Sequence, residues 1–167
     1  MAKEQRPEIK LEFQSFDLIL EGLALMGTIA LVVLPLIHLH QLPDEIPTHF
    51  NASGTPDGYG SKMTLWLLPL IGIGQYVLLT FIARYPQSYN YPVKITGENA
   101  VRQYLIAVRM IRMLKAIIAV IFTFITYKMI ATALGETEGL GSYFIVVFLV
   151  AVFGPIGYYF VRAGRKA

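Results

Sequence analysis

The histidines of the chain lie close together, in or just before a segment rich in proline and glycine. They are His38, His40 and His49. Three carboxylates occur in the same stretch: Asp44, Glu45 and Asp57. Neutral imidazole and carboxylate are a reasonable ligand set for Zn²⁺, and the chain has no cysteine that could replace them. His38, His40, His49 and Asp57 are therefore a candidate zinc site if the segment folds back over its neighbours.

The spacing of the first two histidines leaves an alternative open. His38 and His40 are two positions apart, so on a regular helix their side chains diverge. They converge only if the helix unwinds after Pro35. In the alternative, His38 and His40 are polar caps at a membrane interface, and His49 hydrogen-bonds to the backbone of the loop.

The segment 42–62 is predicted to hold one shape. Prolines fix φ at three positions in it: Pro43, Pro47 and Pro56. Glycines allow positive φ at three others: Gly54, Gly58 and Gly60. Asn51 and Asp57 are turn formers, because their side chains bind nearby backbone groups. A flexible connector would not need this many constraints.

Charged residues interrupt two apolar blocks. Asp17 and Glu21 are four apart, so they share one face of a helix. Leaving Glu21 charged in hydrocarbon would cost several kcal/mol, so we expect it to face Arg109 or Arg112. An ion pair between helices is one interpretation, and a carboxylate that carries protons or ions is the other.

Lys128 is the second intramembrane charge, about 9 Å inside the end of its apolar block at 1.5 Å per residue. It either snorkels to the interface or pairs with Asp44, Glu45 or Asp57. A small transporter that uses Glu21 and Lys128 is a weaker hypothesis. The other midplane polar residues are few: Thr28, Gln75, Thr123 and Thr126.

These residues must be positioned by apolar helices. The chain has 167 residues, of which 55% are hydrophobic and 15% charged, whereas soluble domains have about a quarter charged. Four blocks reach the roughly 20 residues that a span needs: 18–39, 63–83, 114–134 and 140–161. The expected fold class is all-α, a single four-helix transmembrane bundle with an ordered extracytoplasmic loop. Gly72 and Gly74 are expected positions of close helix packing.

The basic residues predict the orientation. They gather in the N-terminal segment (Lys3, Arg6, Lys10), in the C-terminal tail (Arg162, Arg165, Lys166) and between the second and third blocks (Arg84, Lys94, Arg102, Arg109, Arg112, Lys115). The segment 42–62 contributes only Lys62, and the last connection carries Glu136 and Glu138. The positive-inside rule then predicts a multi-pass plasma-membrane protein with both termini in the cytoplasm. The net charge of +3 is too small to indicate nucleic acid.

Residues 98–115 are predicted to form a cytoplasmic amphipathic helix that leads into the third span. Thr96 is the expected N-cap, with Glu98 in the first turn. Basic residues recur along this helix: Arg102, Arg109, Arg112 and Lys115. They either contact anionic lipid or bind a cytoplasmic partner.

The ordered segment also resembles a known family. The pattern is Leu42-Pro43-x-x-Ile46-Pro47-x-His49-Phe50-Asn51-x-x-Gly54-x-Pro56-Asp57-Gly58, with Ile95-Thr96-x-x-Asn99 ahead of the third span. It resembles a bacterial membrane domain of unknown function that forms the N-terminal part of SdpI-type immunity proteins. The resemblance covers about 18–134, and this chain is shorter than the fullest members, with four predicted spans where they carry about six.

The resemblance implies a protein that protects its producer against a secreted, membrane-active peptide toxin. A second implied role is to relay toxin presence by holding a cytoplasmic repressor at the membrane. His49, Asn51, Gly54 and Asp57 match the motif, and Asp44 and Glu45 lie in the same loop, so these are the candidate toxin-facing residues. No nucleophile elbow, P-loop or dinucleotide motif occurs, so the favoured function is non-enzymatic. The alternative is a metal-binding membrane protein or metalloenzyme.

Overall fold

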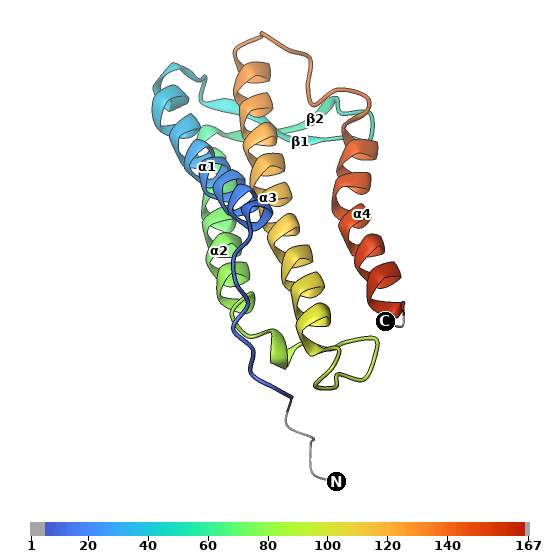
Figure 1. Ribbon diagram of the computed structural model, residues 1–167. Helices are drawn as coiled ribbons and strands as arrows, with labels where there is room; N and C mark the ends of the chain where they lie inside the picture. The colour runs from blue at the N-terminus through green and yellow to red at the C-terminus, as the bar shows by residue number, and fades with distance from the viewer. Residues whose placement is uncertain (1–5, 166–167) are drawn as a thin grey trace.

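A computed structural model describes residues 6–165, and Lys3 and Lys166 of the charge count lie outside them. The described chain is mostly helical (Figure 1). Its helices are α1 (Ser15–His38), α2 (Leu67–Ile82), α3 (Ala100–Ala133) and α4 (Phe144–Gly164). Short 3₁₀ helices cover Leu39–Gln41, Lys62–Trp66 and Pro86–Ser88. Two strands, β1 (Glu45–Phe50) and β2 (Pro56–Ser61), form an antiparallel hairpin between α1 and α2.

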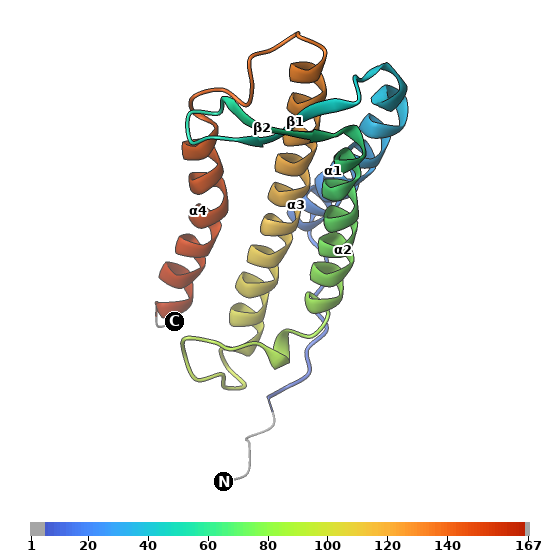
Figure 2. The same ribbon diagram turned by 180° about the vertical axis from the view of Figure 1, so that it is seen from behind.

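The helices form one bundle with the hairpin lying across one end, the hairpin end (Figures 1 and 2). The N-terminal segment, the α2–α3 connection and the last turn of α4 lie at the opposite end, the termini end. α3 is central, because it packs against α1, α2 and α4. Both ends of the described chain therefore lie on one side of the bundle.

Three stretches are long and apolar enough to cross a membrane: Ser15–Gln41, Lys62–Ile82 and Phe144–Gly164. They correspond to three of the four predicted spans. The fourth, 114–134, is the second part of α3, which is not among these three. α3 has 34 residues and is about 51 Å long. The expected amphipathic helix and third span are thus one unbroken helix, which begins at Ala100 after Asn99. Thr96 lies just ahead of it: its hydroxyl accepts from the Asn99 N–H at 3.4 Å, and its own N–H donates to Asn99 Oδ1 at 2.9 Å.

Small residues bring α1 and α3 together. A Cβ on Gly27 would lie 3.1 Å from the Cβ of Ala119, so the two backbones approach closely. The Thr123 hydroxyl donates to the Gly27 carbonyl at 2.8 Å. Gly72 is also a position of close packing, as expected, because a Cβ there would lie 2.4 Å from Cδ2 of Leu31 on α1. Gly74 does not, because a Cβ there would touch nothing within 4 Å.

The N-terminal segment packs on the first turns of α3. Ile9 and Leu11 contact a buried cluster of Ile95, Ala100 and Tyr104. The Tyr104 hydroxyl donates to the Pro7 carbonyl at 3.2 Å. Nearby, burial raises the pKa of Tyr89 to about 12 against a smaller opposing effect of Arg112. The Tyr89 hydroxyl therefore stays protonated at neutral pH, and it donates to the Ile82 carbonyl at 2.7 Å.

The ordered segment 42–62 is a β-hairpin, which the sequence did not predict. Pro47 and the glycines disfavour strands, but each strand of a two-stranded sheet has a free edge where a missing N–H is tolerated. The Asn51 side chain closes the turn by accepting hydrogen bonds from the backbone N–H groups of Ser53 (3.0 Å) and Thr55 (3.1 Å). The buried Ile46 anchors β1 in a cluster with Met129 and Ile130 of α3.

The tip of the hairpin is joined to the α3–α4 connection through glycines. The Leu140 N–H donates to the Gly54 carbonyl at 2.8 Å. Gly54 has φ +79°, and a Cβ there would lie 2.5 Å from the carbonyl oxygen of Gly141. Position 54 therefore needs glycine both for its backbone conformation and for this close contact.

We expect Gly54→Ala to release the hairpin tip. Gly135→Ala is the matched control, because Gly135 has φ +76° but open space around its Cβ position. The control carries only the backbone penalty of about 1 kcal/mol, and Gly54→Ala carries about 1–3 kcal/mol more from the clash. Thermal unfolding in detergent checks this, and equal midpoints for the two variants would contradict the docking of the tip.

Candidate functional site

An imidazole and a carboxylate meet on the exposed face of the hairpin. His49 of β1 and Asp57 of β2 pair through Nδ1 and Oδ1, and their side chains are 72% and 42% exposed. Gly58 lies opposite His49, and a Cβ there would be 2.9 Å from the His49 Cβ. Glycine at 58 thus makes room for the His49 side chain. The pair fixes the imidazole and leaves Nε2 without a hydrogen-bond partner within residues 6–165.

Tyr59 shares its face of β2 with Asp57, and the sequence analysis missed it. Residues at i and i+2 of a strand share a face, and Asp57, Tyr59 and Ser61 are the exposed positions of β2. Tyr59 is 60% exposed. In residues 56–61, side chains that carry polar groups at 57, 59 and 61 alternate with proline and glycine at 56, 58 and 60. This alternation was the available signal, but it is recognisable only once the segment is known to be a strand.

The other predicted loop residues have different positions. Asp44 lies at the base of the hairpin, where the Lys62 ammonium approaches it at 2.9 Å. Glu45 is exposed at the start of β1. Asn51 and Gly54 hold the turn and its docking contact. Of the six predicted toxin-facing residues, His49 and Asp57 therefore form the one side-chain pair.

The four proposed metal ligands do not converge. His38 stays in α1, where Nδ1 lies 2.9 Å from the Leu34 carbonyl oxygen, and His40 is in the following 3₁₀ helix. The helix does not unwind after Pro35, so the chain does not turn back there. In the described part of the chain, no three His, Asp or Glu side chains are placed to hold a metal ion.

A layer of ion pairs joins the helices nearer the termini end. Asp17 of α1 is fully buried, and Oδ1 accepts from Nε of Arg109 at 3.2 Å and lies 2.9 Å from Nη1 of Arg112. The Asp17 carboxylate also accepts from the Gln14 backbone N–H at 3.1 Å. This contact caps the start of α1 and fixes the rotamer that receives the two guanidinium groups.

Glu21 extends the layer to α2. Its carboxylate lies 2.5 Å from the ammonium of Lys115 and 3.4 Å from Nε of Arg112. Lys115 is fully buried, donates to the Thr80 hydroxyl of α2 at 2.9 Å and lies over the Tyr76 ring. Two acids thus meet three bases on α3, so the layer is compensated to within one charge.

These contacts correct the expected role of the basic residues of α3. Arg112 and Lys115 are buried in the layer, so they do not face lipid or a partner. Arg102 donates to the carbonyls of Arg162 and Arg165 at the end of α4. Arg109, Arg112, Ala116 and Ala119 recur at spacings of three and four. That periodicity was the available signal that the cations share the face that packs on α1.

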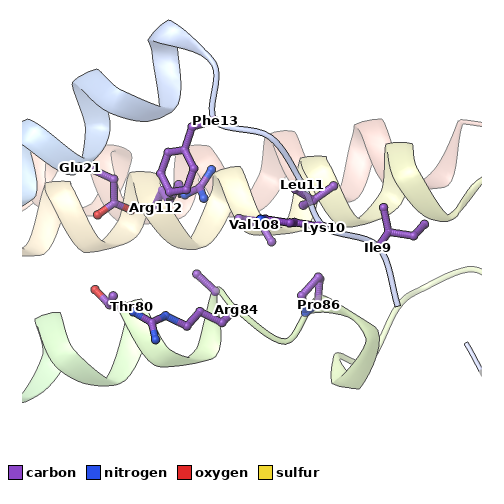
Figure 3. Close-up of a pocket in the computed structure, with 11 residues that line it drawn as sticks. Ile9, Lys10, Leu11, Phe13, Glu21, Thr80, Arg84, Pro86, Val108 and Arg112 are labelled. Carbon is purple, nitrogen blue, oxygen red and sulfur yellow. Dashed lines mark ion pairs between the residues drawn. The ribbon is translucent and has the colours of Figure 1, made fainter. Parts of the chain in front are cut away.

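A cavity of about 370 Å³ leads to the layer from the termini end (Figure 3). The N-terminal segment, the end of α2 and α3 enclose it. Phe13 covers the Arg112 guanidinium, which lies 4.1 Å from the ring centroid. Glu21, Thr80 and Arg84 also line the cavity. The cavity therefore reaches the edge of the ion-pair layer at Glu21, whose side chain is 25% exposed.

The second intramembrane charge does not join this layer. Lys128 is half-buried, with no hydrogen bond or ion pair to any residue in 6–165, so it pairs with none of Asp44, Glu45 and Asp57. It lies 13 residues after Lys115 on α3, about 20 Å along the helix. Glu21 and Lys128 are thus separate features, and no common path between them is apparent from their contacts.

Comparisons with known proteins place the hairpin at the centre of a family domain. Residues 26–73 match the model of a domain of unknown function (DUF1648). That range runs from α1 through the hairpin into α2, so it contains His49, Asp57 and Tyr59. The residues of the ion-pair layer all lie outside it: Asp17, Glu21, Thr80, Arg109, Arg112 and Lys115. An Archaeoglobus fulgidus protein, described only as uncharacterized, is 31% identical over 151 residues, covering 78% of this chain and 81% of its own. No solved structure matches.

Removing the buried Asp17 carboxylate tests the layer. We expect Asp17→Asn to lower the stability by about 3–5 kcal/mol, because it leaves Glu21 as the single carboxylate facing Arg109, Arg112 and Lys115 in a largely buried layer. Asp44→Asn is the matched control: Asp44 also pairs with a cation, but its side chain is 99% exposed. Thermal unfolding in detergent should show a large shift for the first variant and almost none for the second. Similar shifts would contradict the structural role of the layer.

Proposed function

This chain belongs to the same family as the archaeal protein, and we propose that it is a multi-pass membrane protein whose exposed hairpin binds a membrane-active peptide. It would be a non-enzymatic immunity or receptor protein of the SdpI type. The observation that carries the proposal is that the family-domain match is centred on a hairpin that is fixed at both ends and exposes His49, Asp57 and Tyr59.

The arrangement of the helices supports four crossings. Three helices have the length and apolar composition of spans. Both ends of the described chain lie at the termini end, which requires an even number of crossings (Figure 1). α3 supplies the fourth, since its second part carries only Lys115, which is paired with Glu21, and Lys128 as charged residues. The charges of its first part are buried in ion pairs or bound to the end of α4.

The distribution of cations supports an inward-facing termini end. Arg84, Arg162 and Arg165 are exposed there, whereas Lys62 is the cation of the hairpin and its flanks. The positive-inside rule then places the termini in the cytoplasm of a plasma-membrane protein and the hairpin outside. A secreted peptide would meet the hairpin first.

The chemistry of the hairpin suits recognition better than catalysis. The His49–Asp57 pair presents a fixed imidazole, and Tyr59 adds an aromatic surface with a polar tip, a combination common at binding interfaces. Within the described residues no hydroxyl nucleophile is hydrogen-bonded to His49, so the pair lacks the third member that acyl transfer needs.

A relay to the cytoplasm would run through α3. The hairpin packs on Met129 and Ile130 near one end of this helix, and the other end reaches the α2–α3 connection. A peptide that shifts the hairpin would therefore act on an element that spans the whole bundle. The regulator that receives the signal would bind at the termini end, where Arg112 and Lys115 are not accessible to it.

Labelling of single cysteines tests the orientation. The chain has no cysteine, so Ser53→Cys at the hairpin tip and Ser88→Cys in the α2–α3 connection introduce unique thiols at exposed positions. We expect a membrane-impermeant maleimide to label Ser53→Cys in intact cells and Ser88→Cys only after permeabilisation. Labelling of both in intact cells, or of Ser88→Cys alone, would overturn the proposed topology.

Survival assays test the peptide-binding role. Expression of the protein should protect a sensitive strain against at least one member of a panel of membrane-active peptides. His49→Ala and Asp57→Asn should lower the protective concentration range at least tenfold at equal membrane levels. Glu136→Gln is the matched control, since it removes an exposed acid at the hairpin end but outside the hairpin. Killing curves that expression leaves unchanged across the panel would count against the proposal.

A further inference from the structure

A second concave surface lies along the seam between α3 and α4. This groove has a volume of about 870 Å³ and runs over residues 101–113 of α3 and 154–162 of α4, with Phe16 of α1 beside it. It exists because α4 has little bulk on this side: a Cβ on Gly154 would meet nothing within 4 Å. The groove is separate from the hairpin and from the cavity that leads to Glu21.

The walls of the groove are apolar toward the middle of the bundle. Leu105, Ile106, Met110 and Met113 of α3 face Pro155 of α4, and all are partly exposed. Other faces of α4 also expose large apolar residues, among them Val150, Phe153 and Phe160. In a bilayer the groove therefore borders acyl chains, and leaving it empty would forfeit van der Waals contacts along its length.

The end of the groove near the termini is positively charged. Arg162 is exposed, lies over the Tyr158 ring at 6.0 Å and has no acidic partner in the described residues. Arg102 lies beside it, bound to carbonyls that cannot neutralise its charge. Arg109 is already compensated by Asp17, and Glu98 is the single acid among the lining residues.

The groove has an apolar middle and a positively charged end, which is the arrangement that an amphiphile with an anionic head group would fit. Arg162 lies eight residues beyond Gly154 on α4, about 12 Å nearer the termini end. We propose that the groove binds an anionic phospholipid of the adjacent leaflet, with its phosphate at Arg162 and Arg102 and an acyl chain along Leu105, Met110 and Pro155. The proposal rests on membrane embedding and not on peptide binding, so either can fail alone.

Lipid retention by the full-length purified protein tests the site. We expect native mass spectrometry to find one retained phosphatidylglycerol, preferred at least tenfold over phosphatidylcholine. Gly154→Leu should fill the groove and lower this occupancy at least tenfold. Gly74→Leu is the matched control, because position 74 is equally open but lies on α2. Arg162→Gln should abolish the preference for phosphatidylglycerol, whereas Arg84→Gln, an exposed arginine outside the groove, should keep it.

Three results would overturn the proposal. The first is equal retention of the two lipids by the unmodified protein. The second is unchanged occupancy in both Gly154→Leu and Arg162→Gln. The third is an equal loss in Gly74→Leu and Gly154→Leu, which would assign the retained lipid to the general lipid shell. Circular dichroism of each variant shows whether the helices are intact, so that a loss of lipid is not a loss of fold.

Discussion

Two carboxylates on an otherwise apolar helix have to be compensated, and this requirement fixes the position of α3. Asp17 and Glu21 lie one turn apart on α1, and three cations of α3 meet them at the same level of the bundle. Lys115 also reaches Thr80, which ties α2 to the same layer. Because an uncompensated charge at this depth would cost several kcal/mol, the layer leaves little freedom in how the three helices slide past one another.

The hairpin imposes a second constraint at the other end of the bundle. It is anchored by Ile46 against α3 and joined through Gly54 to the α3–α4 connection. The backbone there is held by main-chain contacts, so the exposed side chains of His49 and Asp57 are presented on a rigid support. Rigid presentation lowers the entropy that a binding surface loses on capturing a ligand.

α4 is the least buried helix, which leaves the seam with α3 open.

The sequence predicted those features that depend on one stretch of chain. The lengths of the apolar blocks located α1, α2 and α4 to within a few residues, and the burial cost of Glu21 indicated a cationic partner. The hairpin was missed because strand pairing depends on two segments, and because Pro47, Gly58 and Gly60 lower the strand propensity of both. Arg112 was expected to meet Glu21, but the inward direction of Lys115 was missed, because the energetic cost of burying a cation depends on which side chains face it across the bundle. The predicted metal set assumed a break after Pro35 that the helix does not make.

The ion-pair layer has a consequence for biosynthesis. Asp17 and Arg109 are 92 residues apart in the chain, and Glu21 and Lys115 are 94 apart. At about 5–20 residues per second, α1 leaves the ribosome roughly 5–20 s before its cationic partners are made. During that interval its two acids have no intramolecular counter-charge, so the nascent α1 must wait with Asp17 and Glu21 near the headgroups. The N-terminal segment, which packs on Tyr104, can likewise be seated only after α3 is complete. Residues 7–11 are thus translated well before α3 but reach their final places only after its first turns exist.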